Sequence, residues 1–223
     1  MSNPEDHATE RAIEAAGALA DELRAIGQEL VHRHVEPEAL DRALETAREL
    51  RPLLTGPPRA RWYEVEEPDL FASGTSNAFE AYSPLRGRIN TVAPPLRMER
   101  GTRADGTPCI VGHVRLSSVY EGPPRGVHGG LVAALFDEVL GEAMSLAPPP
   151  GVTAKLSVDY RHLTPVEEDL RLEAWITDAR DRRIRGQATC HAGESLTAEA
   201  RALFVRVDFK QVEDRMRARS KDD

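Results

Sequence analysis

The sequence lacks any apolar run long enough to cross a bilayer. A membrane-spanning helix needs about 18 or more consecutive apolar residues, and no stretch of these 223 residues approaches that length. The first ten residues are acidic and polar instead of a basic segment followed by an apolar one, so we expect no signal peptide. These absences predict a cytoplasmic protein without a membrane partner.

Cysteines, basic residues and aromatic side chains are also scarce. The two cysteines, Cys109 and Cys190, provide neither a disulfide framework nor paired metal-ligand spacing, and their apolar surroundings predict buried thiols. Asp and Glu outnumber Lys and Arg by 37 to 29, which argues against a duplex nucleic-acid partner. With only 5% aromatic residues, stacking surfaces for single strands are few. We expect no nucleic-acid partner, no metal and no cofactor, whereas an anionic small molecule is still compatible with local arginines.

Two amphipathic helices are predicted near the N-terminus. Apolar side chains recur every three or four positions in residues 8–34, and again over about residues 36–51, where Pro37 suits the first turn of a helix. The stripes comprise Ile13, Ala16, Leu19, Leu23, Ile26 and Leu30, then Leu40, Leu44, Ala47 and Leu50. Because a short turn joins them, we expect a helical hairpin over residues 1–52.

Prolines divide the middle of the chain. They recur throughout residues 52–107 and prevent long regular elements there. We therefore interpret residues 53–83 as a linker that wraps over the core with at most short strands or turns. The next domain is expected at residues 84–208, and a charged tail at residues 209–223.

The remaining sequence predicts one long helix among strands. An apolar strand over residues 109–118 precedes a long apolar helix over 129–146, and strands follow at 152–163, 170–180, 182–192 and 196–207. Alternation in the first of these later strands places Val152, Ala154 and Leu156 on one face and Thr153 on the other. In the last strand the apolar set shifts, which predicts a bulge near Ala202. A single helix followed by an antiparallel meander must bury the helix on one sheet face, so the fold class is α+β.

The start of the long helix has the character of an anion-stabilising site. Gly126, Gly129 and Gly130 free the backbone where the helix begins. The first turn presents unpaired N–H groups and the positive end of the helix dipole. Such groups can stabilise an oxygen that gains negative charge during acyl transfer. Plain helix capping explains the same glycines, so this feature does not by itself define a function.

A carboxylate within this helix is the stronger candidate. Asp137 lies at the edge of the apolar arc, and its neighbours one turn away, Ala133, Ala134 and Gly141, are all small. The small residues leave room for a ligand or for another helix. A half-buried Asp far from the helix N-terminus is neither a cap nor an obvious ion-pair partner. Glu138 points to the more exposed side, which indicates solvated surface or an interface.

A family resemblance rests on these residues. GVHGGLVAALFDEVLG, with nine positions from His128 to Asp137, resembles the signature of the PaaI-like hotdog-fold acyl-CoA thioesterases, in which HGG opens a central helix that contains an Asp. GVTAKLSVDYRHLTPV, residues 151–166, resembles the strand that follows that helix. GRINTVAPPL and YEGPPRGVHGG resemble an actinobacterial-type branch most. The resemblance covers about residues 84–207.

The resemblance implies a fold, an activity and a set of roles. The fold is a hotdog, a long central helix wrapped by an antiparallel sheet, here preceded by the helical hairpin. The activity is hydrolysis of an acyl-CoA or related acyl thioester to a free acid and a thiol. The implied catalytic residues are Asp137 as nucleophile or general base, Gly129 polarising the carbonyl through its N–H, and Thr153 orienting water or substrate. The implied substrate-binding residues are His128, Gly130, Arg125 and Glu138. Some relatives carry a polar amide side chain shortly before HGG, where this chain has Gly122, Pro123, Pro124 and Arg125 instead.

Helix geometry predicts that two subunits share each site. Gly129 and Asp137 are eight residues apart, or ~12 Å along one helix axis, so one thioester group cannot touch both on the same helix. We therefore expect a homodimer, in which two antiparallel helices form composite sites, and allow for a dimer of dimers. The alternatives are a hotdog hydratase or dehydratase and a noncatalytic acyl-CoA-binding protein. The HGG motif with Asp137 favours hydrolysis over the first, and Asp137 together with Thr153 argues against the second.

Overall fold

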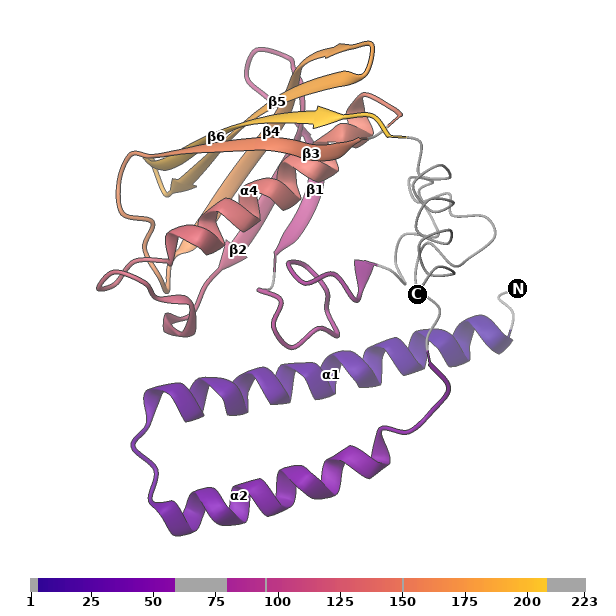
Figure 1. Cartoon of the computed structure of the whole chain (residues 1–223), viewed down its shortest axis with the longest axis vertical. Helices are drawn as coiled ribbons and strands as arrows, with labels where there is room; N and C mark the ends of the chain where they lie inside the picture. The colour runs from indigo at the N-terminus through magenta and orange to yellow at the C-terminus, as the bar shows by residue number, and fades with distance from the viewer. Residues whose placement is uncertain (1–3, 59–79, 95, 150, 208–223) are drawn as a thin grey trace, which may run out of the picture. The chain divides into compact units, whose positions relative to one another are not determined.

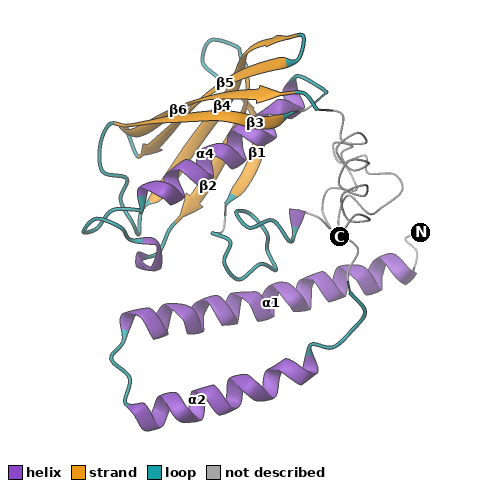
Figure 2. Ribbon diagram, viewed as in Figure 1, coloured by secondary structure: helices purple, strands orange, loops and turns teal. Residues whose placement is uncertain are grey.

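A computed structural model of the chain describes residues 4–58, 80–94, 96–149 and 151–207. The chain divides into two compact units, Met1–Ala93 and Pro94–Asp223. In Figure 1 and Figure 2 the first unit consists mainly of helices, and the second is an antiparallel sheet that curves around a long helix. Most of the expected linker at 53–83, and the expected tail at 209–223, lie outside the described residues.

The first unit contains both of the helices expected near the N-terminus. They are α1 (Pro4–His32) and α2 (Pro37–Leu50), followed by the short 3₁₀ helix η1 (Arg51–Leu53). Pro37 occupies the first turn of α2, where its missing N–H costs no hydrogen bond. The apolar stripe of α2 does not form a core, because Leu40 and Leu44 are 40% and 50% exposed.

Residues 84–93 group with α1 in the first compact unit, whereas the sequence predicted that the next domain begins at residue 84. The guanidinium of Arg24 on α1 donates to the backbone oxygen of Asn90 at 2.8 Å and to that of Arg88 at 3.1 Å. Two charge-assisted bonds to main-chain oxygens fix this turn-rich segment against the helix. The boundary of the second unit therefore falls at Pro94.

The second unit is one six-stranded antiparallel sheet around the long helix α4. Its strands follow the order β1-β2-β4-β5-β6-β3. The elements are β1 (Arg97–Thr102), β2 (Pro108–Arg115), η3 (Ser118–Tyr120), α4 (Gly129–Ala143), η4 (Met144–Leu146), β3 (Val152–Tyr160), β4 (Asp169–Arg180), β5 (Arg183–Ala192) and β6 (Ser195–Val205). The helix and five strands lie where periodicity predicts them. The edge strand β1 has no apolar alternation because it buries none of its residues, so the sequence did not reveal it individually.

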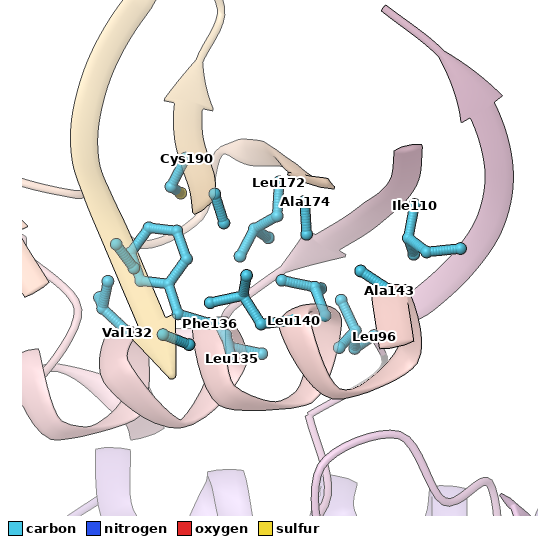
Figure 3. Close-up of a cluster of buried hydrophobic side chains, with 14 of the residues drawn as sticks. Leu96, Ile110, Val132, Leu135, Phe136, Leu140, Ala143, Leu172, Ala174 and Cys190 are labelled. Carbon is cyan, nitrogen blue, oxygen red and sulfur yellow. The ribbon is translucent and has the colours of Figure 1, made fainter. Parts of the chain in front are cut away.

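The core lies between α4 and the concave face of the sheet. Figure 3 shows Phe136 and Leu140 of α4 among side chains of the sheet that include Leu172 and Ala174. The fully enclosed residues of α4 are Val132, Leu135, Phe136, Val139, Leu140 and Ala143. Glycines permit this close packing, since a Cβ on Gly186 would lie 2.9 Å from the Cδ2 of Leu140. The apolar arc predicted for the helix is therefore its buried face, except that Leu131 is only half-buried.

The bulge expected in the last strand near Ala202 lies instead in the facing strand β3, opposite Leu203 and Phe204. From Ala198 onward the last strand, β6, alternates, with Ala202 and Phe204 buried on the core side, and its own irregularity lies at Thr197 in the pairing with β5. The register shifts instead between Thr153 and Lys155 of β3, which leaves one extra residue there. Thr153 pairs with Phe204 and Leu156 with Ala202, so Thr153 shares the face of Leu156. The sequence-based assignment of Thr153 to the opposite face is wrong, because a regular strand was assumed.

Candidate functional site

The loop that leads into α4 is fixed by backbone hydrogen bonds. Val127 N–H donates to the Thr164 oxygen at 2.8 Å, and Val166 N–H donates to the Arg125 oxygen at 3.1 Å. Arg125 has a left-handed backbone, with φ of 61°, and its N–H donates to Glu121 Oε1 at 2.6 Å. The candidate substrate-binding residue Arg125 therefore projects an exposed side chain from a well-anchored turn.

One backbone N–H at the start of α4 remains available. An α-helix leaves the first four N–H groups without intrahelical acceptors. Here His128 N–H donates to the Tyr120 oxygen at 2.9 Å, Leu131 N–H donates to the His128 oxygen at 2.9 Å, and Gly130 N–H donates to His128 Nδ1 at 3.1 Å. Within the described ranges, no acceptor is recorded for the fourth group, the N–H of Gly129. Gly129 is thus the position in this turn that can donate to a ligand oxygen.

His128 is the N-cap of α4, and this contact defines its tautomer. Because Nδ1 accepts the Gly130 N–H, that nitrogen carries the lone pair, and the neutral ring carries its proton on Nε2. The side chain is exposed, so Nε2–H can reach a ligand. Gly130 uses its N–H for this cap, so that N–H is occupied, and the substrate-binding role of Gly130 stays a prediction.

Asp137 and Thr153 meet across α4 and β3. The hydroxyl of Thr153 donates to Asp137 Oδ1 at 2.9 Å. The extra residue in β3 produces this contact, since it turns Thr153 toward the helix. Asp137 is half-buried, and a Cβ on Gly141, one turn further along, would meet no atom within 4 Å. The bond orients the carboxylate and leaves open space beside it.

Glu138, the remaining predicted contact residue, is half-buried next to Asp137 in the chain. It has an interaction of its own, so it is not a free surface carboxylate. Successive helical residues point about 100° apart, so Glu138 faces away from the Thr153 bond. The structure therefore joins Asp137 to Thr153, and the substrate-binding role of Glu138 stays a prediction.

Tyr160 belongs to the site although the sequence did not single it out. Its hydroxyl donates to the backbone oxygen of Gly129 at 2.7 Å. A Cβ built on Gly129 would lie 3.3 Å from this hydroxyl oxygen, so the ring approaches because glycine has no side chain. The available signal was strand alternation, which puts Tyr160 on the same face as Leu156 and Val158. The two ends of β3 thus contact two parts of α4, Thr153 at Asp137 and Tyr160 at Gly129.

Within one chain, the Gly129 N–H and the Asp137 carboxylate remain separate. They lie on one helix, eight residues and ~12 Å apart along its axis. In the part of the chain that the structure describes, no cluster of three His, Cys, Asp or Glu side chains is arranged to hold a metal ion. Among the same residues, no helix is both long and apolar enough to span a membrane.

Comparison with known proteins shows which family the chain resembles. The model of the thioesterase superfamily matches residues 126–199, which include the whole of α4 and β3. Acyl-coenzyme A thioesterase THEM5 of Homo sapiens is 26% identical over 96 residues, which are 42% of this chain and 39% of that protein. Acyl-coenzyme A thioesterase THEM4 of Xenopus laevis is 29% identical over 89 residues, 39% of this chain and 40% of that protein. The chain thus spans about two fifths of the length of these two curated relatives.

A solved structure extends the likeness beyond the sheet and helix. The crystal structure of a thioesterase superfamily protein matches with a TM-score of 0.72 and 28% identity, over 85% of this chain and 90% of that one. A share of 85% exceeds the second unit alone, so the match includes part of Met1–Ala93. The fold of the second unit, with α4 wrapped by an antiparallel sheet, is the hotdog fold expected from the sequence. Residues 126–199 of the chain therefore match the thioesterase superfamily, and the second unit has the hotdog fold.

Proposed function

We propose that this protein hydrolyses acyl-CoA thioesters to a free acid and CoA. The hydrogen bond between Thr153 and Asp137 carries the proposal, because it holds a half-buried carboxylate in one orientation beside open space. The available N–H of Gly129 supplies the second requirement of acyl transfer, a donor for the developing oxyanion. The names of the two curated relatives support acyl-CoA as the substrate class.

The proposed chemistry follows from these two groups. Asp137 either takes a proton from a water that adds to the thioester carbonyl, or adds to that carbonyl itself. In both routes the carbonyl oxygen becomes negatively charged and accepts the Gly129 N–H. The tetrahedral intermediate then collapses, the carbon–sulfur bond breaks, and the CoA thiolate leaves and is protonated. The water route releases the free acid at this point. On the direct route the acyl group stays on Asp137 as a mixed anhydride, which a water molecule then hydrolyses to the free acid. Thr153 keeps Asp137 Oδ1 occupied so that the other carboxylate oxygen faces the reacting group.

The proposed site requires a homodimer. One thioester cannot reach Gly129 and Asp137 of the same helix, because ~12 Å separates them along its axis. The outer edge of β3 pairs with no strand of the described chain, and Ala133, Ala134 and Gly141 on the half-buried face of α4 permit close approach of a second helix. Each site would then combine Gly129 of one subunit with Asp137 and Thr153 of the other. A dimer of dimers and the cytoplasmic location stay predictions.

A direct assay tests the proposal. The purified chain is incubated with a panel of acyl-CoAs of increasing chain length and with an aromatic acyl-CoA, and released CoA is trapped with a chromogenic disulfide. We expect turnover of at least one substrate, and its loss in Asp137→Asn. If calorimetry shows acyl-CoA binding but no thiol is released, the protein is a noncatalytic binder and the proposal is wrong. Addition of water to an enoyl-CoA without thiol release would instead indicate a hydratase.

A further inference from the structure

Two side chains form hydrogen bonds with one peptide unit at the start of α4. The hydroxyl of Tyr160 donates to the carbonyl oxygen of Gly129 at 2.7 Å. The N–H of Gly130 belongs to the same peptide unit and donates to His128 Nδ1 at 3.1 Å. The bonds therefore run in one direction, from the tyrosine hydroxyl through the peptide to the imidazole. A donor on the carbonyl polarises the amide and strengthens the bond that its N–H makes, since consecutive hydrogen bonds reinforce one another.

The His128 ring is confined on two sides. A Cβ on Gly130 would lie 3.2 Å from its Cε1 and Nδ1, and a Cβ on Gly122 would lie 3.2 Å from its Cδ2. Both neighbours are glycines, and a side chain at either position would displace the ring. The ring is thus held between two backbone segments, with Nδ1 directed at the polarised peptide.

We propose that Tyr160 is a positioning residue that acts on His128 through the Gly129–Gly130 peptide. By polarising that peptide, Tyr160 holds His128 in the tautomer that accepts at Nδ1 and donates from Nε2. The exposed Nε2–H is then presented to the bound thioester in one orientation. Tyr160 itself donates its hydroxyl proton to the protein and does not touch the substrate. The kinetic consequence rests on the proposed thioesterase function, whereas the tautomer does not.

Tyr160→Phe tests the proposal because it removes only the hydroxyl and leaves the ring on Gly129. The matched control is Thr177→Val, which removes an exposed hydroxyl that donates to the Arg185 oxygen at 3.2 Å on the β4–β5 pair. Two measurements are made on each folded variant. Two-bond ¹H–¹⁵N correlation spectra of the imidazoles report the His128 tautomer, with His128→Gln for assignment. Steady-state kinetics on the preferred acyl-CoA report kcat and KM.

We expect a single Nε2–H tautomer of His128 in the wild type and in Thr177→Val, and a mixture of tautomers in Tyr160→Phe. We expect kcat of Tyr160→Phe to fall about 3- to 10-fold, the usual effect of one hydrogen bond, with KM largely unchanged. An unchanged His128 spectrum in folded Tyr160→Phe overturns the proposal, even if kcat falls. If the wild type hydrolyses no acyl-CoA, the proposed function fails, and the spectra still decide the role of Tyr160.

Discussion

At the residue scale, Asp137 can be tested by exchanging one oxygen for nitrogen. In Asp137→Asn the amide oxygen can still accept the Thr153 hydroxyl, so the fold and the local contact should persist. The amide can neither take a proton nor attack a carbonyl, and we expect kcat to fall by roughly 10²–10⁴. Steady-state hydrolysis and a thermal melt measure the two properties. Glu138→Gln, which changes the adjacent carboxylate, should keep most of the activity. The reverse ranking of the two variants would move the catalytic role to Glu138.

The two cysteines give a second prediction at this scale. Both are free and each is 1% exposed, and burial raises the pKa of both the Cys109 and the Cys190 thiol above the ordinary value. Only the thiolate reacts with alkylating or disulfide reagents, so a raised pKa lowers reactivity at neutral pH. We expect no labelling of the native protein by a maleimide at pH 7.5, and two labels after denaturation, counted by mass spectrometry. Labelling of the native protein would mean that the strand bearing that cysteine opens in solution.

At the element scale, the junction between α4 and the sheet should dominate the stability of the second unit. Leu140 is fully buried against a surface that includes Gly186, and Leu140→Ala removes packed methyl groups and leaves a cavity. We expect a loss of about 2–5 kcal/mol in the free energy of unfolding. Urea denaturation followed by circular dichroism measures it.

Leu163→Ala is the comparison for this measurement. Leu163 lies in the loop after β3 and is 53% exposed, so its truncation should change the free energy of unfolding by within about 0.5 kcal/mol. An equal cost for Leu140→Ala and Leu163→Ala would contradict the location of the core between helix and sheet.

At the scale of the whole molecule, the shared-site hypothesis predicts complementation between two inactive variants. In Gly129→Val the added side chain would meet the Tyr160 hydroxyl and obstruct the N–H, and Asp137→Asn removes the carboxylate. Each homodimer should be inactive. After reversible dissociation and equimolar mixing, half of the dimers are mixed, and each mixed dimer holds one intact and one doubly defective site. We expect about a quarter of the wild-type activity to return.

Subunit exchange has to be verified in the same samples. Native mass spectrometry of the mixture, with one variant isotopically labelled, shows whether mixed dimers form. If mixed dimers are present and no activity returns, Gly129 and Asp137 do not act together across an interface. If native mass spectrometry finds only monomers and the monomers hydrolyse acyl-CoA, the dimer proposal itself is wrong.

The sequence by itself determined most of the regular elements of the second unit, and it proposed the candidate catalytic groups. Helical and strand periodicities are local consequences of which side chains are buried, so α4 and the later strands could be located without coordinates. The HGG motif located the start of α4. Asp137 was identified as the candidate carboxylate because it lies within the apolar helix among small residues. Periodicity in the helical hairpin predicted two helices correctly but not their burial, since Leu40 and Leu44 stay exposed.

Tertiary structure alone decided how these parts meet. The extra residue in β3 places the Thr153 side chain on the opposite face of the strand. An alternating sequence pattern does not reveal the extra residue, because the register depends on the pairing with β6. The contact between Tyr160 and Gly129 joins positions 31 residues apart and depends on the path of β3 along α4. Residues 84–93 pack with α1 through main-chain oxygens, which carry no sequence signal. Contacts between distant segments depend on register and backbone direction, and neither property is encoded in the residues of one segment.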